Sequence, residues 1–155
     1  MSFQFHALPP EPFAPLFALD DDALHARGMR RVRATAPTGF PCRVSLADAA
    51  PGEALILLHH VHHDVTTPFR AAGPVYVRER ATRAQPALGE VPAFLRVRVL
   101  SLRGYDATGM LQQADVVDGS GIDAALAMLF ANEAVAYVDV HSAKPGCFLC
   151  RATRA

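Results

Sequence analysis

The sequence predicts a domain of the α+β class, built mainly on an antiparallel sheet that can curl into a partial barrel. Three observations carry this prediction. The 155 residues match one domain in length, and no linker, repeat or low-complexity tract divides them, so we expect 1–155 to be a single domain. Short apolar stretches recur between Pro, Gly and Asp turns, as in strands. Only two segments show helix signals, without the regular strand–helix alternation of a parallel sheet.

The first half of the chain predicts two kinds of element, short strands and one short N-terminal helix. Residues 3–8 form a strand candidate that Pro9 and Pro10 end. Residues 20–22 are three aspartates, which suit the N-cap and acidic first turn of a helix ending at Gly28. We prefer this reading to a metal-binding acidic cluster. The strand candidates that follow are 29–34, 41–46 and 53–58, the last running on towards His63.

The second half predicts five more strands and the longer helix. Gly73-Pro74 indicates a sharp turn before a strand at 75–78, and the segment 80–92, rich in Ala, Pro and Gly, reads as a loop. The longest strand candidate is 94–105, joined by a hairpin turn at 106–109 to a strand at 110–117. Apolar residues at helical spacing predict a helix near 121–131. Strands at 134–140 and 147–153 complete the list.

Composition restricts the classes of function and the compartment. The formal net charge is zero, which argues against a nucleic-acid binder, and no segment has the length of a membrane span. Fourteen of the fifteen cationic residues are arginines, a bias typical of a GC-rich genome. No secretory signal is visible, and three cysteines do not suit a disulfide framework. We therefore expect a cytoplasmic protein without nucleic-acid or membrane partners; the sequence does not decide whether it forms a homo-oligomer.

Several phrases, taken in order, resemble a known family. They are 39–46 (GFPCRVSL), 73–79 (GPVYVRE), 102–106 (LRGYD), the strand 135–141 and 146–148 (GCF). In a chain of this size they resemble the bacterial family of short proteins described as domain of unknown function 1203, over nearly the whole chain. The resemblance implies a bacterial single-domain protein. It supplies no catalytic residues, so candidate sites must come from the residues themselves.

The histidine run at 59–63 is the first candidate site. On a regular strand His60 and His62 share a face with Asp64, and such a pair can present two imidazoles to one metal. No glutamate or later histidine completes a cupin-like signature. The alternative is a strand end that frays into a polar loop, which Thr66 and Thr67 favour.

The cysteines are the second candidate. Cys147 and Cys150, with His141 and the distant Cys42, have the ligand types of a zinc site. On a regular strand the three-residue spacing places the two thiols on opposite faces, so buried structural cysteines are the simpler reading. A thiolate at Cys42 or Cys147, activated by His141, is a third reading.

Charged residues within apolar strands are the third and favoured candidate. Such charges must face solvent or pair inside the protein, since burying an unpaired charge is costly. On the last two predicted strands Tyr137, Asp139 and His141 share one face, as do Cys147, Leu149 and Arg151. If the sheet curls, such polar groups can line one pocket suited to a small carboxylate or phosphate ester. The alternative is a solvated face with cross-strand ion pairs. The ligand-binding candidates are Arg43, Arg78, Glu79, Arg103, Asp106, Asp139 and His141, and Arg151 lies in a similar context.

Three functions follow from these candidates. The leading hypothesis is a small-molecule domain that binds an anionic ligand in an arginine-lined pocket, with no evident cofactor. The second is an enzyme that uses His141 with a cysteine or a bound metal, zinc being the ion that its ligand types suit. The third is an interaction module that pairs through an exposed strand edge.

Overall fold

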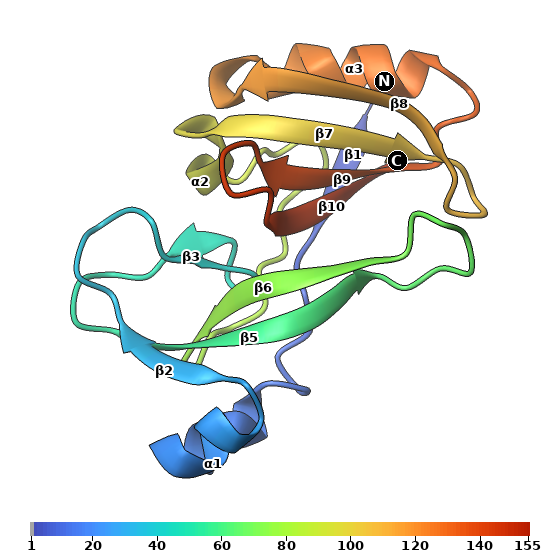
Figure 1. Cartoon of the computed structure of the whole chain (residues 1–155). Coiled ribbons are helices and arrows are strands. Elements are labelled where there is room, and N and C mark those ends of the chain that lie inside the picture. Colours follow the sequence, from blue (N-terminus) through green and yellow to red (C-terminus); the bar gives the residue numbers. More distant parts are fainter. Residues whose placement is uncertain (1) are drawn as a thin grey trace.

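Two five-stranded sheets, stacked one above the other, form the framework of the protein (Figure 1). The structure is a computed structural model and describes residues 2–155. Sheet A is antiparallel throughout, with the strand order β1 (Phe3–His6), β10 (Phe148–Arg154), β9 (Tyr137–Ser142), β7 (Val99–Tyr105) and β8 (Leu111–Asp118). Sheet B is mixed, with the order β2 (Arg30–Arg33), β5 (Ala54–His63), β6 (Ala71–Arg78), β3 (Pro41–Cys42) and β4 (Ala47–Asp48).

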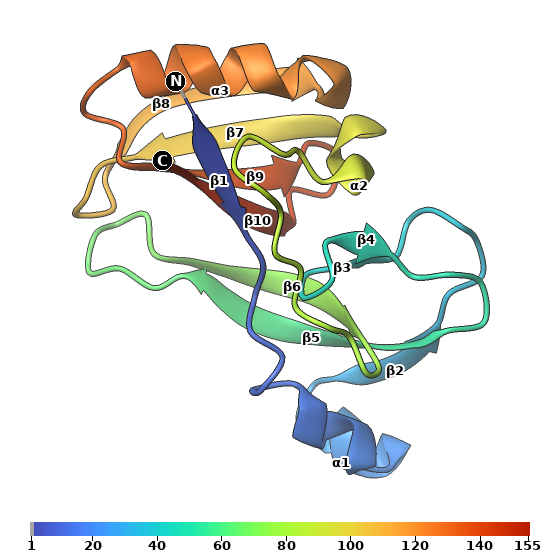
Figure 2. The same ribbon diagram turned by 180° about the vertical axis from the view of Figure 1, so that it is seen from behind.

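Helical elements lie on the outer side of each sheet, and one further short helix lies at an end of the stack (Figure 2). The α-helices are α1 (Asp21–Ala26), α2 (Ala93–Arg96) and α3 (Ile122–Ala131), and the 3-10 helices are η1 (Ala14–Ala18) and η2 (Gly119–Gly121). Figure 2 shows α3 above sheet A and β1 leading the chain down past sheet B to α1. None of the helices within residues 2–155 is long and apolar enough to cross a membrane.

The α+β class and the dominance of antiparallel strands are confirmed, but the partial barrel is not. Neither sheet closes into a barrel, and the parallel pairing of β3 with β6 makes sheet B mixed. The short N-terminal helix and the longer helix near 121–131 are both present. Asp20 caps the first helix by accepting a hydrogen bond from the Ala23 N–H, as predicted for the aspartate cluster.

Three strand predictions are wrong in their bounds. Residues 93–96 form helix α2 instead of the start of a long strand, because Phe94 and Leu95 turn into the core beside α3. Gly73-Pro74 lies within β6 and not at a turn. The Tyr76 carbonyl accepts from the Arg43 N–H and so faces β3; the Pro74 nitrogen, two residues earlier, faces the same side, where none of residues 2–155 is paired with it, so no ladder bond is lost. The expected strand 41–46 ends after two residues, where the chain turns back into β4.

The main apolar core lies between sheet A and α3. Buried side chains of β7, β9 and β10 point towards the helix, whose own buried residues recur at helical spacing. A second cluster joins β5 and β6 to η1 and α1. Since the larger apolar core of each sheet lies on its outer face, the faces that the sheets turn towards one another have room for polar side chains, beside a smaller apolar cluster that includes Leu55 and Tyr76.

Gly119 is required where η2 packs under α2. Its N–H donates to the Arg98 carbonyl, and a Cβ placed on it would lie 2.0 Å from the Leu95 carbonyl oxygen. We therefore expect Gly119→Ala to lower the free energy of unfolding by about 3 kcal/mol, because backbone must move to admit the methyl group. Gly121→Ala, with open space around the added Cβ, is the matched control and should stay within about 0.5 kcal/mol. Denaturant unfolding of the two variants checks this, and equal stabilities would contradict it.

Candidate functional site

A polar layer lies between the two sheets, on the face of sheet A that points away from α3. In β9, Val138 and Val140 belong to the apolar core. Side chains at the alternate positions point to the opposite face; these are Tyr137, Asp139 and His141. The face-sharing that the sequence predicted for these three residues is thus observed.

Neighbouring strands extend this layer to either side of β9. Arg103 of β7 and Arg151 of β10 are the register partners of Asp139, so two guanidinium groups flank one carboxylate. A β-bulge at Leu149 shifts the register of β10. It places Phe148 opposite His141 and sends Leu149 into the core, so the predicted shared face of Leu149 and Arg151 is wrong.

A second β-bulge, in β5 of sheet B, brings two histidines into the polar layer. The pairing of β5 with β6 shifts between Val61 and His63, so the two-residue alternation expected along the histidine run is broken. As a result, His62 and His63 both contact side chains of sheet A. His60 instead lies against the Phe13 ring, with centroids 5.8 Å apart. The fold therefore does not place His60 and His62 together, as the predicted metal site requires.

His62, Asp139 and His141 form the one group of three potential metal ligands within residues 2–155. One donor atom of each lies within 4.8 Å of the other two. His141 and Asp139 are fully buried, whereas His62 is half-buried and stacks on the Phe148 ring at a centroid distance of 5.0 Å. His62 Nδ1 and His141 Nε2 are both buried without a hydrogen-bond partner.

Asp139 is the centre of charge in this layer. Arg151 Nε and Nη2 donate to its two oxygens at 2.6 and 3.0 Å. Burial raises the pKa of the Asp139 carboxyl, while the Arg151 pair opposes that shift. The Arg151 guanidinium also lies 4.2 Å from the centre of the Tyr137 ring. The ion pair with Arg151 thus holds the Asp139 carboxylate in a fixed, buried position.

His63 is held by hydrogen bonds on both ring nitrogens. Its Nδ1 lies 2.7 Å from the Phe69 carbonyl oxygen, and its Nε2 lies 2.8 Å from the Tyr137 hydroxyl. The ring is 1 % exposed and packs on Tyr105. Because both nitrogens are engaged, His63 positions Tyr137 and the end of β5, and it does not offer a free donor.

The two neighbouring imidazoles predict loss of stability in acid. Burial lowers the pKa of His141 to about 3 and that of His62 to about 4, so both are neutral in the folded protein near pH 7. Unfolded histidine binds a proton near pH 6.5, so the unfolded state gains protons as the pH falls below that value, and stability is lost. Burial raises the pKa of Asp139, which acts with the opposite sign at the acid end.

For metal-free protein we expect the free energy of unfolding to fall by about 2 kcal/mol between pH 7 and pH 5 from His141 alone. Urea unfolding in the presence of EDTA at several pH values measures this slope. His141→Gln should flatten it, whereas His25→Gln, on the exposed side of α1, should not. An unchanged slope in His141→Gln would show that other groups carry the acid sensitivity.

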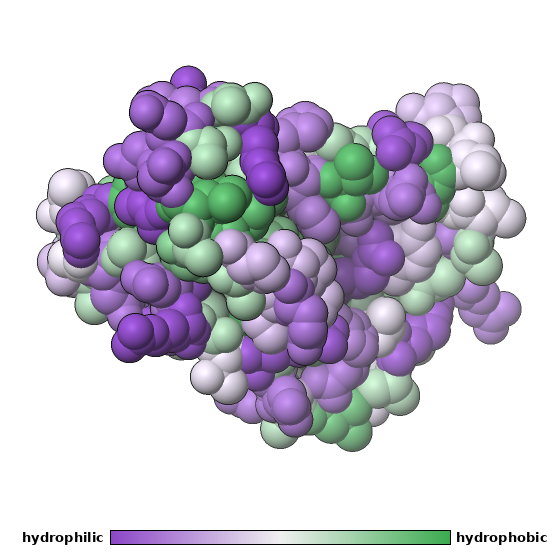
Figure 3. All heavy atoms as spheres, turned by 90° about the horizontal axis from the view of Figure 1, so that it is seen from below, coloured by the Kyte–Doolittle hydropathy of each residue, from purple (hydrophilic) through white to green (hydrophobic). Residues whose placement is uncertain are grey.

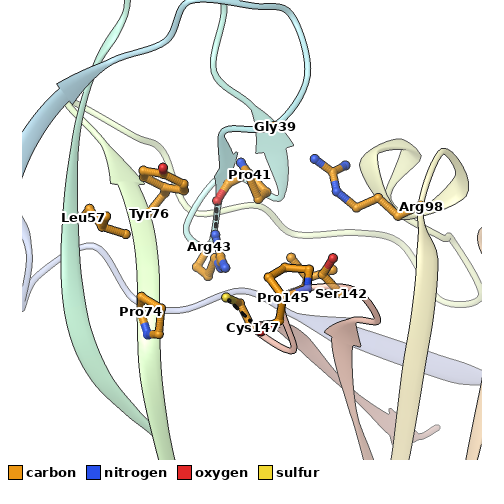
Figure 4. A pocket seen from close by; sticks show the side chains of 11 residues that line it. Gly39, Pro41, Arg43, Leu57, Pro74, Tyr76, Arg98, Ser142, Pro145 and Cys147 are labelled. Carbon is orange, nitrogen blue, oxygen red and sulfur yellow. Dashed lines mark hydrogen bonds between the residues drawn. The ribbon is translucent and has the colours of Figure 1, made fainter.

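A cavity of about 390 Å³ opens next to the polar layer, between sheet B and the turn that joins β9 to β10 (Figure 4). Leu57, Pro74 and Tyr76 form one wall from β5 and β6. The opposite wall is formed by Ser142, at the end of β9, and the turn residues Pro145 and Cys147, and Leu149 of β10 also lines the cavity. The lining is mostly apolar, and its charged members are Arg43 and Arg98.

The two arginines differ in how their charge is balanced. Arg98 Nη2 donates to Asp48 Oδ1 at 2.6 Å. Arg43 is only 2 % exposed, and its contacts are carbonyl oxygens: Nε donates to Phe148 at 2.7 Å and Nη1 to Pro41 at 2.5 Å. Burial lowers the pKa of Arg43 to about 10, which leaves it cationic at neutral pH. No salt bridge within residues 2–155 involves Arg43.

The remaining candidates from the sequence lie elsewhere. Arg78 pairs with Glu53 at 3.1 Å, and Glu79 is exposed beside it, outside both the cavity and the polar layer. Asp106 closes the β7–β8 hairpin by accepting hydrogen bonds from the Thr108 and Met110 N–H groups. The predicted arginines and carboxylates therefore do not line one pocket. Arg103, Asp139 and His141 lie in the polar layer and Arg43 lines the cavity, whereas Arg78, Glu79 and Asp106 lie outside both.

The three cysteines are free and do not converge on one site. Cys42 and Cys150 are buried in different apolar clusters, and burial raises the pKa of the Cys150 thiol. Cys147 is half-buried and lines the cavity near Arg43. His141 Nδ1 donates to the Gly146 carbonyl at 2.9 Å, and the hydrogen bonds of residues 2–155 include none between His141 and a thiol. The thiolate reading therefore gains no support.

Sequence reasoning missed the partners that complete both sites. His63 and Phe148 enter the polar layer because of the two bulges, and Arg98 enters the cavity after helix α2. Gly146 has a positive φ of 77°, and its carbonyl accepts the hydrogen bond from His141. This glycine is the one local feature of the sequence that indicates the tight turn at 142–147.

Comparison with known proteins places the chain in a family. Neither the curated proteins nor the solved structures contain a match. A family model matches residues 39–154, which include every residue of the cavity and of the inter-sheet layer described above, whereas β1, η1, α1 and β2 precede the match. The match extends over more than half of the chain, so the chain belongs to the family described as "Protein of unknown function (DUF1203)".

Proposed function

We propose that the chain binds a small organic anion, a carboxylate with an apolar body, in the cavity beside Arg43. The observation that carries this proposal is a buried guanidinium that lines a cavity and forms no ion pair with a carboxylate of residues 2–155. An uncompensated buried charge is costly, and an anion entering from solvent offsets that cost.

The cavity supports an organic anion in preference to an inorganic ion. Its volume of about 390 Å³ is in the range of small-molecule sites. Leu57, Pro74, Tyr76 and Leu149 offer apolar contact area, while Arg43 offers the polar contact that fixes orientation. Asp48 already balances the charge of Arg98, so we assign the recognition of the anionic group to Arg43.

Calorimetric titration with matched pairs tests the proposal. Each pair consists of a carboxylate and its neutral amide, such as benzoate and benzamide or 4-methylpentanoate and its amide. We expect at least one carboxylate to bind with 1:1 stoichiometry and at least 10-fold more tightly than its amide, since a hydrogen bond to a charged group contributes about 1.5–3 kcal/mol. Equal affinities within every pair would contradict the role given to Arg43.

The strand-edge alternative has weaker support. The free edges are β1 and β8 in sheet A and β2 and β4 in sheet B. The face seen from below, that of sheet B and α1, is largely hydrophilic, with apolar residues in patches between polar ones (Figure 3). On β8, the exposed Val116 lies next to Asp115 and the strand ends at Asp118, and such charges oppose edge-to-edge pairing.

A further inference from the structure

We infer that His62, Asp139 and His141 bind one divalent transition-metal ion between the two sheets. This site is distinct from the Arg43 cavity, with which it shares no residue, and it does not depend on the function proposed there. Two nitrogen donors and one carboxylate oxygen suit Zn²⁺, Co²⁺ or Ni²⁺ better than Mg²⁺ or Ca²⁺.

The histidine nitrogens carry this inference. Buried polar atoms are nearly always hydrogen-bonded, so two unpartnered ring nitrogens beside one carboxylate need an explanation. In His141, Nδ1 donates to the Gly146 carbonyl, which leaves Nε2 as the atom with the free lone pair. A backbone carbonyl that fixes the tautomer in this way is one of the common outer partners of a metal-bound histidine.

The three donors come from both sheets. His62 lies on β5 of sheet B, whereas Asp139 and His141 lie on β9 of sheet A. The donor atoms lie within 4.8 Å of one another. Ligands of a tetrahedral zinc ion are about 3.3 Å apart, so binding would draw the three side chains together around the ion. A bound ion would therefore connect β5 to β9 and stabilise the packing of the two sheets.

The charges around the site predict a further ligand. Arg151 holds Asp139 through both carboxylate oxygens, each of which keeps a lone pair for the metal. Arg103, the register partner of Asp139 on the other side, adds a second cation to the layer. With a divalent ion present, the positive charge exceeds that of the single carboxylate, so the open fourth position favours an anion or hydroxide over a neutral ligand.

Cobalt(II) titration of the untagged protein tests the site directly. Tetrahedral Co²⁺ gives intense visible absorption bands, so the readout reports coordination and does not require an activity. We expect one equivalent of Co²⁺ to bind, to be displaced by Zn²⁺ but not by Mg²⁺, and to raise the melting temperature. The Tyr76→Leu variant, which changes a wall of the anion cavity, should give the same spectrum, and this separates the metal site from the anion cavity.

Variants decide which histidines bind the ion. His62→Gln and His141→Gln should each weaken Co²⁺ binding by about 100-fold or more, because loss of a ligand exceeds the 10- to 100-fold effect of an outer partner. His59→Gln, exposed on the same strand, is the matched control and should bind as the wild type does. Near-ultraviolet circular dichroism checks that each variant is folded. Absence of the bands in wild-type protein, or their loss in His59→Gln and not in His141→Gln, would overturn the assignment.

Discussion

Arg43→Met is expected to weaken binding of the carboxylate ligand by about 10- to 100-fold. Methionine keeps an unbranched apolar stem but is shorter than arginine and carries no cation, and a hydrogen bond to a charged group contributes about 1.5–3 kcal/mol. The amide partner of the ligand should lose little, since its contacts are with the apolar walls of the cavity. Isothermal titration of the carboxylate and amide against both proteins measures the two effects.

The control for this experiment is an arginine outside the cavity. Arg96 pairs with Asp123 on the surface, so Arg96→Met alters the net charge equally without touching the lining. If Arg96→Met weakens carboxylate binding as much as Arg43→Met does, the effect comes from the overall charge of the protein. The predicted selectivity for a charged ligand would then have no local cause.

Asp139→Ala is expected to lower the free energy of unfolding by about 2–3 kcal/mol in metal-free protein. Removing one partner of a buried ion pair leaves the other charge uncompensated, which costs about 3–5 kcal/mol when both are buried. The Arg151 side chain is 33 % exposed, so solvent screens part of that cost. Denaturant unfolding in EDTA measures the change without any contribution from a bound ion.

A double-mutant cycle separates the ion pair from the cavity that the substitution creates. Arg151→Met and the double variant Asp139→Ala/Arg151→Met complete the cycle. We expect the double variant to be more stable than the sum of the single changes predicts, with a coupling of at least 1 kcal/mol between the two positions. Additive losses would mean that Asp139 acts through packing and not through Arg151.

The sequence predicted the individual helices and strands better than it predicted the tertiary contacts between them. The periodicity of Leu126, Leu129 and Phe130 was sufficient for α3, because a helix face is defined by residues close in the chain. The shared face of Tyr137, Asp139 and His141 was also predictable, since it requires only that β9 be a regular strand.

The sites themselves depend on features without a local signal. His62 reaches Asp139 only because of a bulge in β5 and the stacking of sheet B on sheet A, and neither is encoded in the spacing of the histidines. Arg43 was identified as a charge within an apolar segment, but its position in a cavity depends on contacts about 100 residues away, such as its hydrogen bond to the Phe148 carbonyl. Arg78 has a similar sequence context and pairs with Glu53 instead.

Arginine side-chain NMR reports directly on whether Arg43 binds an anion in the cavity. The Arg43 Nε–Hε resonance can be assigned as the signal that Arg43→Met removes, and it can be followed during titration with benzoate or the tightest carboxylate of the panel. We predict a saturable shift of this resonance that the matched amide does not cause, while the resonance of the exposed Arg70 stays unchanged. An unchanged Arg43 resonance, with shifts confined to exposed arginines, would rule out anion binding at Arg43 and place the anion on the surface.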